Sequence, residues 1–381
     1  MRTLAIQGRP HEQPPLPDVI QYLRLLPERG GSDMFFSVGA PPHLKAEGHS
    51  QPADDRVLQN GEVKTLAWQL MSPAQAQDFE RDLEMNLALS VPDVGRFRAN
   101  IYFQRGEVAM VVRLIKQVIP DVTSLGLPPI LDKLAMQDRG LILVIGAAGA
   151  GKSTTLASML DFRNRHRSGH IVCIEDPIEF LHTHKKSIID QREVGLDTHS
   201  YEDALRNVLR EAPDVIMLGE IRDAATMQHA LHYAETGHLC VATLHGTSCR
   251  HAIERVTRFF PDEARPQVLA DLSQNILALV GQRLVPGTHQ RRAVAVELVL
   301  GTPHIRGIIQ RDELPELKGA VERALESGMQ SFDQSLYKLL EEGRVSVSDA
   351  LKFADSRTDL ALKIKLERGM DADSTGPVFG S

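Results

Sequence analysis

Residues 141–153 read LILVIGAAGAGKS, a short apolar run followed directly by a glycine-rich loop. The last eight of these residues match the pattern G-x-x-x-x-G-K-[ST] of phosphate-binding loops. The apolar run predicts a buried strand, and the glycines allow backbone N–H groups to face an anion. A helix that begins near Lys152 adds the positive end of its dipole. The stretch therefore predicts a strand, a loop and a helix that bind a nucleoside triphosphate.

The residues of the loop have distinct expected roles. The Lys152 ammonium is placed to reach the β and γ phosphates, and the Ser153 hydroxyl is a ligand for Mg²⁺. Helical spacing of Leu156, Met159 and Leu160 supports the helix after the loop. We therefore expect ATP and Mg²⁺ as cofactors. The residues expected to bind the nucleotide are Gly146, Gly149, Ala150, Gly151, Lys152, Ser153 and Thr154.

Four nearly continuous apolar runs, at 141–145, 171–174, 215–218 and 239–244, divide this part of the chain. Strands that are apolar at every position are buried on both faces, as in a parallel sheet covered by helices. In such sheets the ligand lies at the carboxyl ends of the strands. The sequence therefore predicts an α/β fold with one site where the four runs end.

Acidic residues follow the second and third runs. Hydrolysis of a γ-phosphate requires charge neutralisation and an oriented water molecule. Glu179, in a loop shaped by Pro177, is the better-placed general base, and Glu175 and Asp176 are expected to cap or brace that loop. Glu220 follows the third run and is expected beside the Mg²⁺ that Ser153 binds.

Two histidines flank the fourth run. His245 follows its end, where a ring nitrogen can donate a hydrogen bond to the γ-phosphate. His238 precedes its beginning, and both a structural and a catalytic role stay open for it.

Composition limits the function classes. The 381 residues suffice for about two domains, and the formal net charge of −7 disfavours a nucleic-acid motor. Three separated cysteines without a C-x-x-C pair disfavour a zinc module. No apolar stretch is long enough to span a membrane, and the first residues do not resemble a secretory signal. We expect a cytoplasmic protein without membrane insertion.

Proline and glycine content suggests the domain boundaries. Polar, proline-rich residues 1–17 and the aperiodic residues 370–381 are expected to be disordered tails. Pro and Gly cluster at 120–129, which predicts a linker between an N-terminal domain at 18–119 and an ATPase domain at 130–369.

The N-terminal domain is expected to be α+β. We expect a strand at 34–38, a helix at 76–89 and a hairpin at 96–115 with its turn at 105–107. Alternation along the first hairpin strand places Phe97, Ala99 and Ile101 on one face and Arg96 and Arg98 on the other. These arginines are either solvated charges or phosphate contacts. Beyond residue 248 the pattern predicts mainly helices, the better ones at 271–284 and 334–340.

Several motifs together resemble the bacterial secretion ATPases, and more narrowly the type IV pilus retraction (twitching motility) ATPases of the PilT/PilU family. Besides the phosphate loop, the similar segments are 174–180 ("Asp box"), 218–223 (Walker B), and 235–239 with 243–245 ("His box"). The similarity covers nearly the whole chain and includes Gly30–Asp33 and Arg96–Arg98. Residues 191–198, 328–333 and 349–351 are more similar to the PilU type than to the PilT type.

The resemblance implies a hexameric ring of RecA-like domains, each preceded by a smaller PAS-like domain. It implies that Glu179 is the catalytic glutamate, that Glu220 is the Walker B acid, and that His238 and His245 form the His-box pair. Candidate arginines acting on the nucleotide from the N-terminal domain are Arg96, Arg98, Arg105 and Arg113.

The implied function is a motor ATPase that retracts type IV pili at the inner face of the inner membrane, acting on the pilus platform protein. Residues 304–311 read HIRGIIQR, where the principal retraction enzyme carries AIRNLIRE, which suggests a PilU-type accessory to a PilT-type ATPase. Alternatives are a pilus assembly or type II secretion ATPase, which commonly has a further N-terminal domain and a four-cysteine zinc module, and a RecA-like nucleic-acid translocase. A non-hydrolysing scaffold is disfavoured by Glu179 and Glu220.

Overall fold

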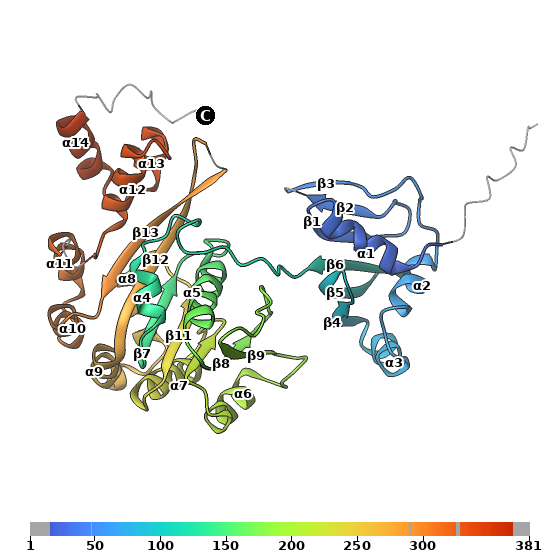
Figure 1. Cartoon of the computed structure of the whole chain (residues 1–381), viewed down its shortest axis with the longest axis horizontal. Helices are drawn as coiled ribbons and strands as arrows, with labels where there is room; N and C mark the ends of the chain where they lie inside the picture. Colours follow the sequence, from blue (N-terminus) through green and yellow to red (C-terminus); the bar gives the residue numbers. More distant parts are fainter. Residues whose placement is uncertain (1–15, 47, 290, 325–327, 369–381) are drawn as a thin grey trace, which may run out of the picture. The chain divides into compact units, whose positions relative to one another are not determined.

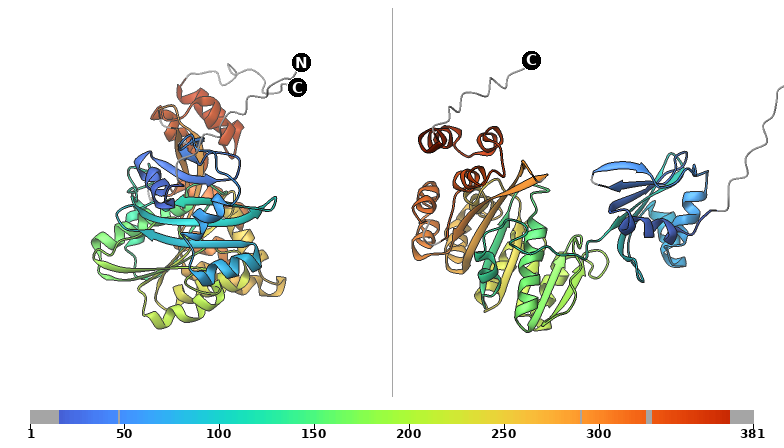
Figure 2. Two further views of the ribbon diagram at one scale, coloured as in Figure 1. Left: turned by 90° about the vertical axis from the view of Figure 1, so that its right-hand side faces the viewer. Right: turned by 45° about the horizontal axis from the view of Figure 1, so that its top comes forward.

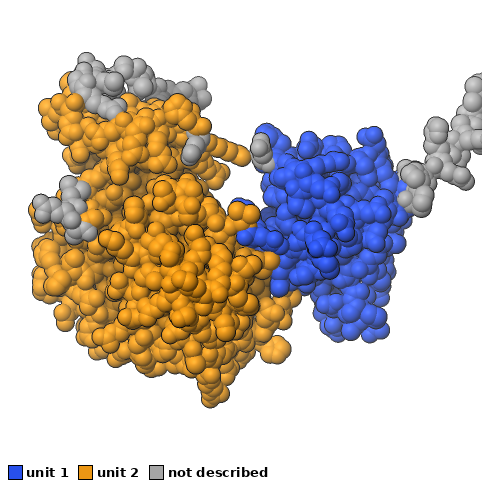
Figure 3. All heavy atoms as spheres, in the orientation of Figure 1, with its two compact units in different colours: residues 1–117 blue, residues 118–381 orange. Residues whose placement is uncertain are grey.

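The computed structural model describes residues 16–46, 48–289, 291–324 and 328–368. The chain divides into two compact units, residues 1–117 and 118–381 (Figure 3). Residues 1–15 of the expected N-terminal tail, and all of the expected tail at 370–381, lie outside the described residues. No helix in the described ranges is long and apolar enough to cross a membrane.

The first unit is built on a six-stranded antiparallel sheet with the strand order β3-β2-β1-β6-β5-β4 (Figure 1). Its core includes residues of all three helices as well as the sheet. The elements are α1 (Val19–Glu28), β1 (Gly31–Phe36), β2 (His43–Ala46), β3 (His49–Pro52), α2 (Glu62–Trp68), α3 (Pro73–Asp82), β4 (Glu84–Val91), β5 (Gly95–Gln104) and β6 (Glu107–Leu114).

The predicted hairpin is confirmed as β5 and β6. Phe97, Ala99 and Ile101 are fully buried, as the alternation predicts. Gln104 pairs with Glu107 across a two-residue turn, in which Arg105 and Gly106 have φ values of 52° and 82°. Two positive φ values match the twist of the flanking strands, which favours this short turn.

The helix predicted at 76–89 is wrong in its second half. Helix α3 ends at Asp82, because Leu83 has a left-handed φ of 65° and its N–H bonds to the carbonyl of Phe79. The following residues form β4, which pairs with β5 along its whole length. Cross-strand pairing therefore overrides the helical spacing of the sequence. The strand expected at 34–38 begins earlier, as β1.

The second unit is a seven-stranded sheet, in the order β13-β12-β7-β11-β10-β8-β9, with helices on both faces (Figure 2). All neighbouring pairs are parallel except β12 and β13. The elements up to β11 are α4 (Ile130–Ala135), β7 (Gly140–Ile145), α5 (Lys152–His166), β8 (Gly169–Glu175), β9 (Ser187–Glu193), α6 (Tyr201–Val208), η1 (Leu209–Glu211), β10 (Val215–Leu218), α7 (Ala224–Glu235) and β11 (Leu239–Leu244).

The remaining elements include the two strands at one edge of this sheet, β12 and β13, and the helices of the C-terminal part. They are α8 (Cys249–Arg258), η2 (Asp262–Ala264), α9 (Arg265–Asn275), β12 (Ile276–Pro286), β13 (Arg292–Leu300), α10 (Pro303–Gln310), η3 (Leu314–Glu316), α11 (Leu317–Arg323), α12 (Phe332–Glu341), α13 (Val347–Phe353) and α14 (Arg357–Arg368).

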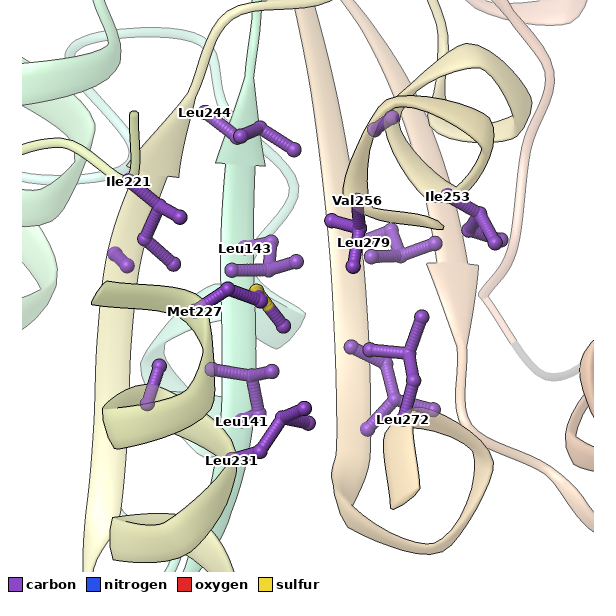
Figure 4. Packing of buried hydrophobic residues seen from close by; sticks show 14 of the residues in the cluster. Leu141, Leu143, Ile221, Met227, Leu231, Leu244, Ile253, Val256, Leu272 and Leu279 are labelled. Carbon is purple, nitrogen blue, oxygen red and sulfur yellow. The ribbon is translucent and has the colours of Figure 1, made fainter. Parts of the chain in front are cut away.

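The four apolar runs are confirmed as the parallel strands β7, β8, β10 and β11. Alternate residues of each strand face two different hydrophobic clusters. One cluster contains α4 and α5, and the other contains α6 to α9. In the second cluster, Leu141 and Leu143 of β7 pack near Met227 and Leu231 of α7 (Figure 4). Burial on both faces explains why these strands are apolar at every position.

The helix predicted at 271–284 is wrong. Helix α9 ends at Asn275, and the chain continues as the long strand β12 between β7 and β13. A buried apolar run does not by itself distinguish a strand from a buried helix, and here two neighbouring strands supply its hydrogen bonds. The expectation of a mainly helical C-terminal part fails for β12 and β13, whereas the helix predicted at 334–340 lies within α12.

Arg283 of β12 connects the sheet to the C-terminal helices. Its guanidinium lies 3.8 Å from the ring centroid of Phe332 at the start of α12. It donates to the carbonyl of Phe353 at 2.8 Å and pairs with Asp355 at 2.5 Å, between α13 and α14. The same guanidinium donates to the carbonyl of Thr247 at 2.8 Å, in the loop that follows β11. One side chain therefore joins that loop to α12, α13 and α14.

Candidate active site

The phosphate loop connects β7 to α5 and requires its glycines. Gly149 and Gly151 have left-handed φ values of 74° and 90°. A Cβ on Gly146 would lie only 2.8 Å from the Cβ of Ala150 and 2.9 Å from the carbonyl of Gln282. No side chain caps the start of α5. Its first backbone N–H groups therefore form the kind of anion site that the sequence predicts.

Lys152 lies inside this loop, and its side chain is largely buried. Its Nζ donates to the carbonyls of Gly146 and Ala147, both at 3.0 Å. Burial lowers the pKa of the ammonium group, and the charge of Glu220 acts in the opposite direction. The ammonium is therefore held among backbone carbonyls of the loop and near an acidic side chain.

A cavity of about 140 Å³ lies at the carboxyl ends of β7, β8, β10 and β11. Five residues expected at the site line it together: Lys152, Ser153, Glu179, Glu220 and His245. They come from strand ends that lie side by side in the sheet, although they are far apart in sequence. This is the position at which open α/β sheets bind ligands.

Glu220 has a basic partner at each carboxylate oxygen. His245 Nε2 lies 2.6 Å from Glu220 Oε1, and Arg222 Nε donates to Oε2 at 2.8 Å. Arg222 also donates to Asp176 at 3.2 Å, and its pKa is raised, mainly by the hydrogen bond to Glu220. Arg222 therefore links the ends of β8 and β10. The sequence motif contains Arg222, but sequence reasoning assigned it no role.

Tyr201 of α6 is a second residue that sequence reasoning missed. Its hydroxyl donates to the carbonyl of Ile174 at 3.0 Å and accepts from the backbone N–H of Glu220 at 3.3 Å. A Cβ on Gly219 would lie 2.9 Å from this hydroxyl, so the glycine permits the contact. These two hydrogen bonds hold the backbone at Glu220 beside the end of β8. No local sequence pattern indicates Tyr201, because the contact exists only after the chain has folded.

Glu175 ends β8 and is almost completely buried beside the cavity. Burial raises the pKa of its carboxyl to about 7, with further contributions from the charges of Glu179 and Glu193. A hydrogen bond from Gln191 Nε2 at 2.9 Å opposes this effect. Glu175 therefore changes its protonation state near neutral pH.

His238 does not line this cavity in its own chain. It precedes β11, whereas His245 follows it, and β11 contains six residues. At about 3.3 Å per residue, the strand separates the two histidines by roughly 20 Å. His238 Nδ1 lies 3.2 Å from the hydroxyl of Thr236 and 3.3 Å from the carbonyl of Tyr233.

The candidate arginines belong to the first unit. Arg113 Nε pairs with the buried Asp33 at 2.7 Å. Arg98 lies opposite Arg113 in the β5–β6 ladder, and Arg105 occupies the hairpin turn. The buried Nε of Arg96 has no hydrogen-bond partner among the described residues. Contact between these arginines and a nucleotide stays a prediction.

Ser153 and Glu220 have the type of side chain that binds a magnesium ion. A hydroxyl and a carboxylate are oxygen ligands, which Mg²⁺ prefers, and Mg²⁺ typically completes its shell with phosphates and water. Within the described ranges, no group of three or more His, Cys, Asp or Glu residues is suited to hold a metal ion by itself.

A second cavity, of about 230 Å³, lies on the other side of the phosphate loop. Its lining combines loop residues with Arg292, Gln282 and apolar side chains of the segment before α4. Of this lining, the sequence predicted only the loop residues Ala150 and Gly151 and the adjoining Thr154. The lining residues are Ser124, Leu125, Leu127, Ala150, Gly151, Thr154, Thr155, Gln282, Leu284, Arg292 and Val294.

Comparison with known proteins identifies the family. The model of the type II/IV secretion system proteins matches residues 82–366. The chain is 47% identical to the type IV pilus ATPase PilU of Pseudomonas aeruginosa over 92% of each chain. It is 38% identical to the type IV pilus retraction ATPase PilT of the same species, over 87% of this chain and 97% of PilT.

A crystal structure of the pilus retraction motor PilT with bound ADP superimposes with a TM-score of 0.84. It is 38% identical and covers 90% of this chain and 98% of that chain. The greater similarity to PilU than to PilT agrees with the sequence motifs. The chain therefore belongs to the type II/IV secretion system protein family, among the type IV pilus ATPases of the PilT/PilU type.

Proposed function

We propose that this chain is a motor ATPase that couples ATP hydrolysis to the retraction of type IV pili. One observation carries the proposal: Lys152, Ser153, Glu179, Glu220 and His245 line one cavity at the carboxyl ends of parallel strands. The chain that carries this cavity is similar over most of its length to proteins named type IV pilus ATPase and pilus retraction ATPase.

Each residue has a role in the proposed reaction. Lys152 neutralises phosphate charge, and the backbone N–H groups of the loop bind the neighbouring phosphate oxygens. Glu179 orients the attacking water and accepts its proton. Mg²⁺, when bound through Ser153 and Glu220, neutralises further phosphate charge. His245 donates a hydrogen bond to the γ-phosphate and contacts Glu220 at the same edge of the sheet.

The second cavity suits the nucleoside half of ATP. It adjoins Gly151 of the phosphate loop and Thr154, which follows Ser153, and its apolar side chains and Arg292 offer both packing and polar contacts. We infer that Thr154 and this lining hold the sugar and the base.

The assembly that we propose is a hexameric ring of RecA-like domains with PAS-like N-terminal domains. A heterologous interface closes into a ring or continues into a filament, and nucleotide sites of this kind are often completed by an arginine from another subunit. Arg96, Arg98, Arg105 and Arg113 are the proposed donors of that charge. His238, at the far end of β11, is proposed to act at a subunit contact because it does not line the cavity of its own chain.

We further propose an accessory role beside a PilT-type ATPase, at the inner face of the inner membrane and on the pilus platform protein. The segment at 304–311 that departs from the principal retraction enzyme forms most of α10. None of its residues lines the catalytic cavity. Hydrolysis is therefore expected to be independent of this segment, whereas coupling to pilus movement is expected to depend on it.

Replacement of the general base tests the ATPase assignment. Glu179→Gln keeps the shape of the side chain but accepts no proton. We expect turnover to fall by roughly 100-fold or more, with the dissociation constant of a fluorescent ATP analogue within about twofold. Glu254→Gln, in a pair with Arg250 on α8, is the matched control and should retain activity. Unchanged turnover in Glu179→Gln would transfer the base role to another residue.

Pilus retraction in the source bacterium tests the cellular role. Deletion of a retraction motor increases the number of surface pili, whereas deletion of an extension motor abolishes them. A strain that contains this protein but lacks the PilT-type enzyme is expected not to retract its pili. Ordinary retraction in that strain would contradict the accessory role and would make this chain a self-sufficient motor.

A further inference from the structure

The loop from Glu175 to His182 forms one wall of the catalytic cavity and carries Glu179. After Glu175, which ends β8, residues 176–182 contain no helix or strand, so no regular ladder within them fixes the position of Glu179. The backbone groups of an irregular segment need partners elsewhere in the fold. The neighbouring edge strand β9 supplies several of them.

Gln191 of β9 contacts this loop through three hydrogen bonds. Its Nε2 donates to Glu175 Oε1 at 2.9 Å and to the carbonyl of Phe180 at 2.8 Å. Its Oε1 accepts from the backbone N–H of His182 at 2.9 Å. Both amide donors and one acceptor site are therefore used, on the two sides of Glu179 in the chain.

Two other buried side chains hold the adjoining backbone. Glu193 Oε2, also on β9, accepts from the N–H of Ile178 at 3.3 Å. Asn164, which is completely buried on α5, donates to the carbonyl of Thr183 at 2.7 Å. Helix α5 is also the helix that begins at Lys152. The loop is thus braced from β9 and from the helix of the phosphate loop.

We propose that Gln191 is the positioning residue for Glu179: its amide fixes the loop so that Glu179 faces the reacting water. Gln191 does not itself line the cavity, so it acts through the loop and without contact to the nucleotide. The inference rests on the proposed role of Glu179 as general base. A displacement of about 1 Å at a catalytic group is enough to reduce a rate by up to about 100-fold.

The contact between Gln191 and Glu175 makes the brace sensitive to pH. Above about pH 7 the Glu175 carboxylate accepts a charge-assisted bond from the amide, and below it the carboxyl is protonated and the bond is weaker. Other titratable groups face Glu175 or share its cavity. They are Lys152, Cys173, Asp176, Glu179, His182, Glu193, Tyr201, Glu220 and His245.

The first experiment compares Gln191→Ala with Asp190→Ala. Asp190 is the neighbouring residue on β9, but its side chain is more than half exposed and contacts His170. For Gln191→Ala we expect turnover at least about tenfold lower, with the dissociation constant of a fluorescent ATP analogue within about twofold. Asp190→Ala should match the wild type. Wild-type turnover in Gln191→Ala, or equal losses in turnover and nucleotide binding, would overturn the positioning role.

Gln191→Glu adds a readout that a purely structural role would not change. At pH 8 the introduced carboxylate faces that of Glu175, and both donors to the loop are lost. As the pH falls to 6, the two carboxyl groups take up a shared proton, which restores one donor. Turnover relative to the wild type should therefore rise as the pH falls. A ratio that is constant with pH would contradict the proposal.

Amide hydrogen exchange tests the positioning role of Gln191 separately from the role of Glu179 as general base. In Gln191→Ala, exchange at residues 176–182 should accelerate, because the N–H of His182 loses its acceptor. Unchanged exchange there would contradict the positioning role. Wild-type turnover in Glu179→Gln would overturn the base assignment, whereas wild-type turnover in Gln191→Ala would overturn only the role of Gln191.

Discussion

His245 Nε2 lies 2.6 Å from Glu220 Oε1, across the ends of the adjacent strands β11 and β10. The contact places a side chain that is predicted to meet the γ-phosphate directly against one that is predicted to bind the metal. A substitution of either residue therefore removes a direct contact of the other.

We expect His245→Ala to bind nucleotide but to hydrolyse it slowly. Loss of one preorganised donor to a phosphate in the transition state costs roughly 10- to 1000-fold in turnover. Steady-state ATPase kinetics and an equilibrium binding assay provide the comparison. His232→Ala, at an α7 residue that does not line the cavity, is the control. If His245→Ala loses nucleotide binding and not turnover, His245 is a binding residue.

Lys152→Ala should abolish nucleotide binding or hydrolysis and leave the fold intact. Among the described residues, the ammonium donates hydrogen bonds to loop carbonyls, and burial already disfavours its charge. Its removal therefore takes away phosphate charge and little core packing. Circular dichroism melting and an ATPase assay test this, with the exposed Lys133→Ala as control. A normal melt together with normal activity would refute the site.

The carboxyl of Glu175 should make stability depend on pH. Its pKa is raised from 4.5 to about 7 in the folded chain, so its favourable contribution is present below pH 4.5 and is lost as the pH rises through 7. The shift corresponds to on the order of 3 kcal/mol. Glu175→Gln cannot ionise, so at pH 8 it should unfold at higher urea concentration than the wild type. The difference should nearly vanish at about pH 4, below the unfolded pKa, and a difference independent of pH would contradict this assignment.

Mixed rings test whether Arg98 acts across a subunit interface. Lys152→Ala and Arg98→Ala are each expected to be inactive alone, but a mixture should recover some ATPase activity because some sites combine two intact halves. Mixing Lys152→Ala with Glu179→Gln is the control without rescue, since both changes affect the same cavity. Absence of rescue together with a monomeric mass by light scattering would count against the ring.

The sequence predicted most of the sheet and the convergence of the site because both depend on local patterns. Strands buried on two faces are apolar throughout, and residues that follow parallel strands meet at one edge. Glu179, Glu220 and His245 were found in this way. The strand β12 was missed because its apolar run fits a helix equally well until its neighbours β7 and β13 are known.

The contacts that orient the site could not be predicted from the sequence. Gln191 is an ordinary polar residue in a strand, and Tyr201 is the first residue of a short helix. Their roles come from hydrogen bonds to backbone groups that only the folded chain brings near. Almost every residue has the same backbone N–H and C=O groups. The residue type of the backbone partner therefore does not indicate such a contact in the sequence.

The four contacts of Arg283 connect the loop after β11 directly to the C-terminal helices. The loop that carries His245 leads to Thr247, and Arg283 ties Thr247 to the junction of α13 and α14. A displacement of this loop either carries the terminal helices with it or breaks the guanidinium contacts. Arg283 is thus a direct side-chain link between the loop that leaves the catalytic cavity and the last three helices.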